Sequence, residues 1–398
     1  MTVRDVDIAR ALIPVLSGEP SAVAERLHAE PDGVYRATLP NDTHVWVVSR
    51  YDDVKRLLAD PRLAVNKRNS RTGYQGFGLP PALDANLLNL DGADHARLRR
   101  LVTSAFTARR VEQLRDRIQA TSRALVDALS SAGAVDLVAA YTAPLPVAVI
   151  CDLLGVPADQ GSTLRECTKV LLSPGKYGPA DLAATLGRIL GLLTELIAAK
   201  RTEPTDDLLT AMICAHDGDD RLSADELVSL AFLILFAGYE NSVHLISAAV
   251  ARALAEPRLA AAIRAEPDPH TEPMNRITEQ FLKYDQPATT AIRRFPTEDV
   301  KVGDAVIPAG DTVLLATTAA NHDPAAGGSG HVSFGHGAHY CLGAPLARLE
   351  VRIAVWTLLR RLPGLTLTVP YRDLEWKSDH RQHALVTVPV TLTPQSTG

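Results

Sequence analysis

The chain has 398 residues, of which 46% are hydrophobic and 22% are charged, and its formal net charge is -5 at pH 7. This length and composition fit a large soluble enzyme with a sizeable buried core. The slightly acidic balance gives no electrostatic case for binding nucleic acid.

The cysteines are scattered along the chain without Cys-x-x-Cys spacing, at Cys151, Cys167, Cys214 and Cys341. This pattern indicates neither a disulfide framework nor a zinc site, and it suits a reducing cytoplasm. Residues 1–7 are polar, and they do not have the pattern of a signal peptide or a membrane anchor. We therefore expect a cytoplasmic protein without a membrane partner.

The first predicted elements lie between residues 43 and 59. Residues 43–49 (THVWVVS) are rich in β-branched and aromatic side chains, which predicts a strand. Residues 51–59 have the spacing of a short amphipathic helix, and Pro61 ends it. By itself, such a unit is typical of many mixed folds.

A second helix is predicted for residues 90–106, with Asp91 or Asp94 as an acidic N-cap. His95 and Arg99 lie four positions apart on one face of this helix, so both can reach a single anionic group. The alternative is a solvated polar face, which is the usual explanation for a run of charges.

Between residues 111 and 220 the sequence predicts helices separated by turns. Helical spacing runs through residues 111–154 and 161–200, with an interruption at residues 173–175 (SPG). Another helix is predicted to begin within residues 205–209 (TDDLL). The acidic positions from 217 to 220 lack the order of an EF-hand loop, so we interpret them as solvated turn residues.

The longest predicted helix starts at Ser223 and ends before Pro257. Ser223 and Glu226 have the spacing of a capping box. At about 1.5 Å per residue the helix is roughly 50 Å long, enough to cross the molecule. Its apolar run, residues 227–238, is too short to span a membrane, so we expect it to be buried in protein.

The most informative stretch is residues 334–343 (FGHGAHYCLG), which precedes a predicted helix over residues 344–359. Its glycines permit positive φ or a close approach to a flat ligand. Cys341 then stands near a helix N-terminus, where unpaired N–H groups and the helix dipole favour a thiolate. Such a thiolate can act as a nucleophile or a metal ligand, whereas a lone cysteine is more often a buried structural residue.

The order F-G-x-G-x-H-x-C-L-G resembles the haem-binding loop of cytochromes P450. In that family the cysteine thiolate is the proximal ligand of the haem iron. The resemblance implies that Cys341 binds the iron of haem b (iron protoporphyrin IX), and that Phe334, Gly335 and Gly343 shape the haem-binding loop. It also implies the cytochrome P450 fold, mainly α with a smaller β region, as one domain over residues 1–398.

Further segments resemble the same family. Residues 46–65 are similar to its N-terminal sheet region and following helix, and residues 90–106 are similar to its C helix. Arg97 and Arg100 are then candidates for a basic proximal patch that docks an acidic redox partner. The resemblance implies that four side chains bind the haem propionates: His95, Arg99, Arg294 and His339.

Within the long helix, residues 237–242 (AGYENS) resemble the family's oxygen-binding A-G-x-[D/E]-T motif. Ala237, Gly238 and Glu240 are kept, and Gly238 allows the helix to open or bulge beside a ligand. Asn241 replaces the threonine that helps to deliver protons to bound oxygen, and an amide cannot relay a proton as a hydroxyl does. Ser242 lies about 100° further round the helix and should not simply substitute. We therefore expect Glu240 and Asn241 to act in an altered oxygen-activation step.

Residues 278–284 (TEQFLKY) resemble the family's K helix, whose Glu-x-x-Arg pair locks the core. Gln280 and Lys283 stand in the positions of that pair, and Glu279 is one residue out of phase. A glutamine and a lysine cannot form a bidentate carboxylate–guanidinium clamp. We expect that this pair no longer serves as the core clamp.

The meander loop that follows in the family is also missing. After residues 320–324 (ANHDP), only residues 325–330 (AAGGSG) precede His331. The meander carries the arginine that completes the family's triad with the Glu-x-x-Arg pair. All three triad positions have therefore changed together, which indicates a coherent loss.

The resemblance spans nearly the whole chain and implies a haem-thiolate monooxygenase that oxidises a small organic molecule of secondary metabolism. Its electrons would come from a ferredoxin and a ferredoxin reductase. One alternative is atypical haem chemistry, such as phenol coupling or peroxide-driven oxidation. A second is a degenerate haem-binding partner protein without turnover, which the apparently complete haem cradle disfavours.

Overall fold

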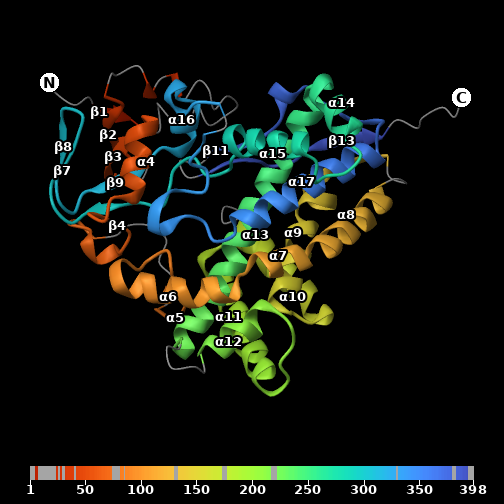
Figure 1. Cartoon of the computed structure of the whole chain (residues 1–398), viewed down its shortest axis with the longest axis horizontal. Coiled ribbons are helices and arrows are strands. Elements are labelled where there is room, and N and C mark those ends of the chain that lie inside the picture. The colour runs from red at the N-terminus through yellow and green to blue at the C-terminus, as the bar shows by residue number, and fades with distance from the viewer. Residues whose placement is uncertain are drawn as a thin grey trace, which may run out of the picture.

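Helices make up most of the molecule, and short strands form smaller sheets (Figure 1). The computed structural model describes residues 5–7, 24–25, 27–28, 32–39, 42–73, 81–84, 86–129, 133–172, 177–216, 222–328, 330–378 and 382–392. The predicted fold class, mainly α with a smaller β region, is confirmed in this part of the chain.

In chain order the α-helices are α4 (Tyr51–Ala59), α5 (Pro81–Asp84), α6 (Gly92–Ala105), α7 (Ala108–Gln113), α8 (Arg115–Leu129), α9 (Pro144–Leu154), α10 (Ala158–Leu172), α11 (Pro179–Thr202), α12 (Leu208–His216), α13 (Ala224–Ala255), α14 (Pro257–Ala265), α15 (Glu272–Tyr284), α16 (Thr317–His322) and α17 (Ala344–Arg361). The strands are β1 (Asp5–Asp7), β2 (Val34–Thr38), β3 (His44–Val48), β4 (Leu63–Ala64), β5 (Ala134–Asp136), β6 (Phe295–Pro296), β7 (Val300–Val302), β8 (Ala305–Ile307), β9 (Thr312–Leu315), β10 (Leu365–Leu367), β11 (Trp376–Ser378), β12 (His383–Leu385) and β13 (Pro389–Leu392).

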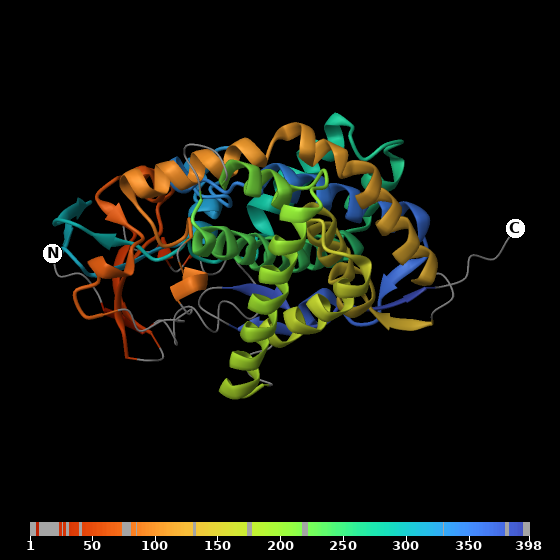
Figure 2. The ribbon, with the colours of Figure 1, turned by 90° about the horizontal axis from the view of Figure 1, so that it is seen from below.

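One sheet joins strands that are far apart in the sequence, in the order β1-β2-β3-β9. β2 and β3 are antiparallel, whereas β1 pairs with β2, and β3 with β9, in parallel. β3 and α4 confirm the predicted strand and helix between residues 43 and 59. Val54 and Leu57 of α4 pack in one apolar cluster with Val48 and Leu315 of the sheet. Figures 1 and 2 show this sheet at one end of the molecule and the β10-β13-β5 sheet toward the other.

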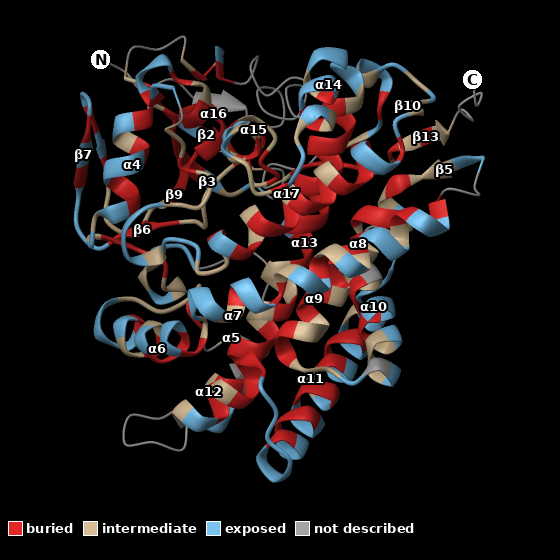
Figure 3. Ribbon diagram, turned by 45° about the vertical axis from the view of Figure 1, so that its right-hand side comes forward, coloured by how far each residue is buried: buried red, intermediate tan, exposed pale blue. Residues whose placement is uncertain are grey.

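The long helix α13 runs through the core and packs against α5, α9 and α17 (Figure 3). The capping box is confirmed, because Ser223 and Glu226 each accept a hydrogen bond from the other's backbone N–H. By length and composition α11 and α13 are both apolar enough to span a membrane. Most of the apolar stretch of α13 is buried inside the protein, however, as the sequence predicted for a core helix.

The region between α6 and α13 follows the predicted series of helices. Residues 111–154 include the second half of α7 and all of α8 and α9, with β5 and a π-helical turn at Val138–Thr142 before α9. The next stretch forms α10 and α11, while the interruption predicted at residues 173–175 lies outside the described residues. The acidic positions between 217 and 220 also lie outside them.

The C-terminal strands belong to different sheets. β12 ends at Leu385 and β13 begins at Pro389. β12 pairs with β11, whereas β13 pairs with β10 and β5. Residues 386–388 therefore connect two different sheets and cannot continue one strand.

A single tight turn connects α16 to the cysteine loop. Asp323 caps a 3-10 turn, η3 (Pro324–Ala326), by accepting from the N–H of Ala325. Gly327 has a φ of 63°, and a Cβ at Gly330 would lie only 2.2 Å from the carbonyl oxygen of Ala326. Glycine is required where the backbone doubles back so closely. The short connection predicted in place of a meander is confirmed.

Candidate active site

The cysteine loop leads into the N-terminus of α17, as predicted. Gly335 and Gly337 have φ values of 73° and 74°. A Cβ at Gly337 would lie 2.7 Å from the Cα of Ala59 in α4, so only glycine fits where the loop passes this helix. The N–H of Cys341 donates to the carbonyl of Phe334 at 2.8 Å, which closes the loop.

The surroundings of Cys341 act on the pKa of its thiol in opposite directions. Although Cys341 is exposed, the protein atoms packed around the sulfur displace water and raise the pKa, and this effect outweighs the N–H groups of Gly343 and Ala344 and the charges of Arg99 and Arg348, which lower it. The N–H groups at the start of α17 therefore favour the thiolate as expected, but removal from water disfavours the charged sulfur more strongly. A bound metal cation reverses this balance, since coordination deprotonates a thiol.

Two imidazoles meet at the cysteine loop. The ring of His95 on α6 lies against that of His339 in a 3-10 turn, η4 (Gly337–His339), with 4.1 Å between their centroids. His95 is buried, and its Nε2 has no hydrogen-bond partner within the described residues. Burial, together with the charges of His339 and Arg99, lowers the pKa of His95 to about 4, so its ring is neutral near pH 7. His339 Nε2 lies 3.6 Å from Asp91 Oδ1.

Arg99 and Arg294 lie close enough to His95 for their charges to lower its pKa. The side chain of Arg294 is almost completely enclosed, with 2% of the residue exposed, and Nη1 donates to the carbonyl of Ile292 at 3.2 Å. Burial lowers the pKa of Arg294 to about 10 and also lowers that of Arg99. In the part of the chain that is described, neither arginine forms a salt bridge with a carboxylate. Arg294 is buried and Arg99 is half-buried, and guanidinium groups without a carboxylate partner at such positions fit an anionic ligand.

Asp91 occupies the N-cap position of α6, as predicted, but its carboxylate accepts from the backbone N–H groups of residues 65 and 66 and not from α6. Arg97 forms an ion pair with Glu226 of α13, so its charge is already neutralised and not available to a proximal patch. Arg100 is exposed and lines an open hollow of about 450 Å³ beside α6.

The glycine of the distal motif serves helix packing. α13 continues as a regular α-helix through residues 237–242, so the opening or bulge that Gly238 allows is not formed. A Cβ at Gly238 would lie 2.6 Å from Cδ1 of Ile150 in α9. The absence of a side chain therefore lets α9 and α13 approach each other.

The polar residues of the distal motif point to different surroundings. Glu240 is buried, and its Oε1 lies 4.0 Å from Nε2 of His244. Asn241 is exposed, and its Nδ2 donates to the carbonyl of Ala237 one turn earlier at 3.4 Å. Ser242 is buried and donates to Glu350 of α17, so it does not take the place of the missing threonine.

A family model described as "Cytochrome P450" matches residues 11–153 and 192–326. Cytochrome P450 107B1 of Saccharopolyspora erythraea is 40% identical over 384 residues, which cover 92% of this chain and 93% of that protein. The 6-deoxyerythronolide B hydroxylase of the same organism is 36% identical over 370 residues, covering 87% and 90%. The solved structure of ligand-free P450 monooxygenase TamI has a TM-score of 0.87 and 36% identity, and it covers 98% of this chain and 94% of that chain. The chain belongs to the cytochrome P450 family.

This P450 is a haem-thiolate monooxygenase that oxidises a small organic molecule of secondary metabolism. The predicted family, fold and enzyme class are confirmed. The residues present also fit a haem group. Within the described residues, Nε2 of His95 has no hydrogen-bond partner and Arg99 and Arg294 form no salt bridge, so all three side chains could bind propionates, and Cys341 lies in the loop that leads into α17.

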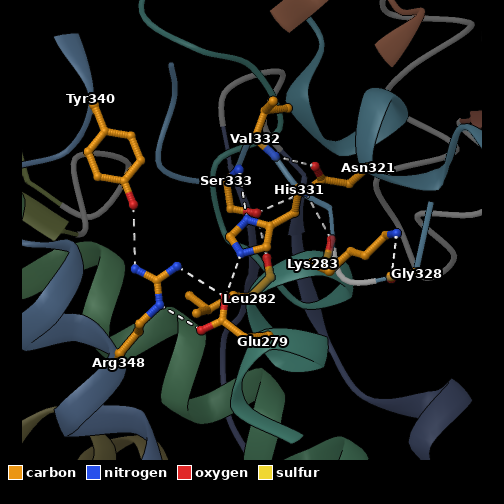
Figure 4. Close-up of polar contacts among 10 residues, drawn as sticks. All are labelled: Glu279, Leu282, Lys283, Asn321, Gly328, His331, Val332, Ser333, Tyr340 and Arg348. Atoms are coloured by element: carbon orange, nitrogen blue, oxygen red, sulfur yellow. Dashed lines mark hydrogen bonds and ion pairs between the residues drawn. The ribbon is translucent and has the colours of Figure 1, made fainter. Parts of the chain in front are cut away.

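Gln280 and Lys283, which stand in the positions of the family's K-helix pair, do not bond to each other in this P450. Gln280 of α15 is exposed. Lys283 is buried, with 4% exposed, and its Nζ donates to the carbonyls of Gly327 at 2.6 Å and Gly328 at 3.2 Å. Lys283 therefore holds the short turn that stands where the meander is missing (Figure 4).

Glu279, one residue before the position of the family's K-helix glutamate, forms an ion pair that the sequence did not reveal. Glu279 of α15 bonds to Arg348 of α17 and to His331, the first residue after the shortened loop (Figure 4). Neither partner was predicted. The sequence does place Arg348 seven positions after Cys341, but only the packing of α15 against α17 brings it to Glu279.

Proposed function

We propose that this P450 hydroxylates a polyketide-derived small molecule, with electrons from a ferredoxin and its reductase. One observation carries the haem-dependent part of the proposal. The Cys341 loop lies close to the imidazoles of His95 and His339 and to the guanidinium groups of Arg99 and Arg294, and these two arginines form no salt bridge within the described residues. The substrate class is supported by a relative that is named for hydroxylating 6-deoxyerythronolide B.

Haem b is the proposed cofactor, with Cys341 as the proximal ligand of its iron. When bound, haem with a thiolate ligand supplies the O₂ activation that hydroxylation needs. Phe334, Gly335 and Gly343 would shape the loop that carries the thiolate. Four side chains would hold the propionates by charge-assisted hydrogen bonds: His95, Arg99, Arg294 and His339.

Ala237, Gly238, Glu240 and Asn241 are the proposed residues of the oxygen-activation side. Glu240 is a buried carboxyl group and can hold a proton close to the substrate. Asn241 can donate a hydrogen bond through its amide, but it cannot pass a proton onward. Proton delivery in this P450 would therefore depend on Glu240, on water or on a hydroxyl group of the substrate.

We further propose a cytoplasmic protein that folds as one domain over residues 1–398 and has no membrane or nucleic-acid partner. The scattered cysteines suit a reducing compartment, and the net charge of -5 does not attract nucleic acid. Arg100, exposed beside the hollow along α6, is the candidate contact for an acidic ferredoxin.

The test is a CO-difference spectrum of the reduced protein, followed by a screen of macrolide and polyketide ligands for a shift in haem spin state. The native protein should give the red-shifted Soret band of a thiolate-ligated complex. Cys341→Ala should lose that band, whereas Cys214→Ala, an exposed cysteine remote in sequence, should keep it. An unchanged spectrum in Cys341→Ala would overturn the assignment of the iron ligand.

A second candidate, peroxide-driven oxidation, is favoured by Asn241, which stands where the family carries its proton-delivering threonine. Its test compares product formation with peroxide and with a ferredoxin system on the same substrate. Faster product formation with peroxide would support it, and product formation only with ferredoxin would exclude it.

A further inference from the structure

Glu279 of α15 and Arg348 of α17 form a bidentate ion pair. Arg348 Nε donates to Glu279 Oε1 at 2.6 Å, and Nη2 donates to Oε2 at 3.0 Å. Both side chains are 30% exposed, so the pair is partly shielded from water. Two parallel bonds fix the plane of the guanidinium group, which a single contact would not do.

The same carboxylate also holds the segment that enters the cysteine loop. His331 Nε2 lies 2.9 Å from Glu279 Oε2, and the hydroxyl of Ser333 donates to the carbonyl of Leu282 in α15 at 2.6 Å. The N–H of Val332 donates to the side chain of Asn321 at 2.8 Å. Residues 331–333 are therefore tied to α15 and α16 at three successive positions (Figure 4).

Arg348 in turn contacts the cysteine loop at two positions before Cys341. Its guanidinium group lies over the ring of Phe334, 4.7 Å from the centroid, and Nη1 lies 3.5 Å from the hydroxyl of Tyr340. Phe334 is the residue whose carbonyl accepts from the N–H of Cys341. One side chain thus connects the start of the loop, the residue next to Cys341 and the neighbouring helix α15.

Both members of the pair are charged over the working pH range of a protein. Burial raises the pKa of Glu279, but the bonds from His331 and Arg348 outweigh it and lower the pKa to about 2. Burial acts to lower the pKa of Arg348, but the Glu279 carboxylate outweighs this effect and raises that pKa. The ion pair is consequently not broken by titration near neutral pH.

We propose that Glu279 and Arg348 are positioning residues that hold the Cys341 loop in the geometry for thiolate ligation, and that they replace the lost Glu-x-x-Arg clamp. This inference rests on the proposed function, in which Cys341 binds haem iron. Arg348 contacts Phe334, and the carbonyl of Phe334 accepts from the N–H of Cys341, so loss of the ion pair would loosen the backbone that carries the sulfur.

The experiment compares three variants of the haem-loaded protein: Glu279→Gln, Arg348→Lys, and the double variant Glu279→Gln/Arg348→Gln. Arg348→Lys keeps a positive charge but loses the planar fork and the stacking on Phe334. The matched control is Arg361→Gln, which removes an exposed ion pair with Asp127 from the far end of α17. The readouts are the fraction of the reduced CO complex with the thiolate band, and its decay with time.

We expect Glu279→Gln and Arg348→Lys each to lose the thiolate band several-fold faster than the native protein. The double variant should be no worse than the single ones, because the two residues act as one unit. Arg361→Gln should decay like the native protein. Thermal unfolding of all variants separates a loss of positioning from a general loss of stability.

The outcomes are distinguishable. If the native protein itself shows no thiolate band, the proposed function fails. If the native protein shows it and both single variants retain it as long as Arg361→Gln, the positioning role is overturned. A lowered unfolding temperature with an unchanged thiolate fraction also overturns it, because the pair is then only structural. If Glu279→Gln does not fold, Arg348→Lys alone decides between these results.

Discussion

The hydroxyl of Ser242 in α13 donates a hydrogen bond of 2.7 Å to Oε2 of Glu350 in α17. Only 1% of Glu350 is exposed, and its Oε1 has no partner within the described residues. Burial raises the pKa of Glu350 to about 8, although the bond from Ser242 opposes this shift. The two core helices are therefore joined through a carboxyl group that is neutral at pH 7.

This relationship predicts that the contribution of Glu350 to stability falls as the pH rises from about 4.5 to about 8. In that window the unfolded chain has lost the Glu350 proton while the folded protein keeps it, so raising the pH favours unfolding. The contribution reaches about 5 kcal/mol at most, at about 1.36 kcal/mol per pH unit. Glu350→Gln should remove this pH dependence, which urea unfolding at pH 5 and pH 8 measures. An unchanged slope in Glu350→Gln would contradict the prediction.

We predict that Arg99 and Arg294 control how tightly haem is held. The double variant Arg99→Gln/Arg294→Gln removes two charge-assisted hydrogen bonds, each worth about 1.5 to 3 kcal/mol. It should release haem to apomyoglobin about 100-fold faster than the native protein or more, since each 1.4 kcal/mol is about tenfold. Arg361→Gln serves as the control for a lost arginine elsewhere. Native-like haem retention in the double variant would refute the propionate assignment.

The two substituted K-helix positions should respond differently to mutation. Gln280→Ala removes an exposed side chain and should change the free energy of unfolding by less than about 0.5 kcal/mol, with normal haem incorporation. Lys283→Met removes the donor to the carbonyls of Gly327 and Gly328 and should destabilise the protein by about 1 to 3 kcal/mol. Denaturant unfolding measures both. Insoluble or haem-free Gln280→Ala would show that Gln280 keeps the old structural role.

Because Asn241 stands in place of the threonine, we predict that electron consumption is poorly coupled to product formation. Without a hydroxyl group to deliver protons, more electrons should leave as peroxide, and Asn241→Thr should lower the ratio of peroxide to product. Ser242→Ala is the control, because Ser242 faces Glu350 and should leave the ratio unchanged. Tight coupling in the native protein that worsens in Asn241→Thr would instead show that Asn241 is an adapted catalytic residue.

The sequence by itself determined the local structure and the identity of the cysteine loop. The bounds of α4, the capping box of α13 and the glycines before Cys341 follow from hydrophobic spacing, side-chain caps and allowed backbone angles. These properties depend on neighbours within a few residues along the chain. The order of ten residues around Cys341 was specific enough to indicate the family before any fold was known.

The tertiary structure decided which distant groups meet and how strongly each is removed from water. It paired Arg97 with Glu226, placed Ile150 against Gly238, and gave Glu279 its partner Arg348. It also added a desolvation effect that outweighs the expected effect of the helix N-terminus on the Cys341 thiol, because the cost of removing a charge from water depends on every surrounding atom. Contacts between α13, α15 and α17 join residues far apart in sequence, and one sequence carries no local signal for them.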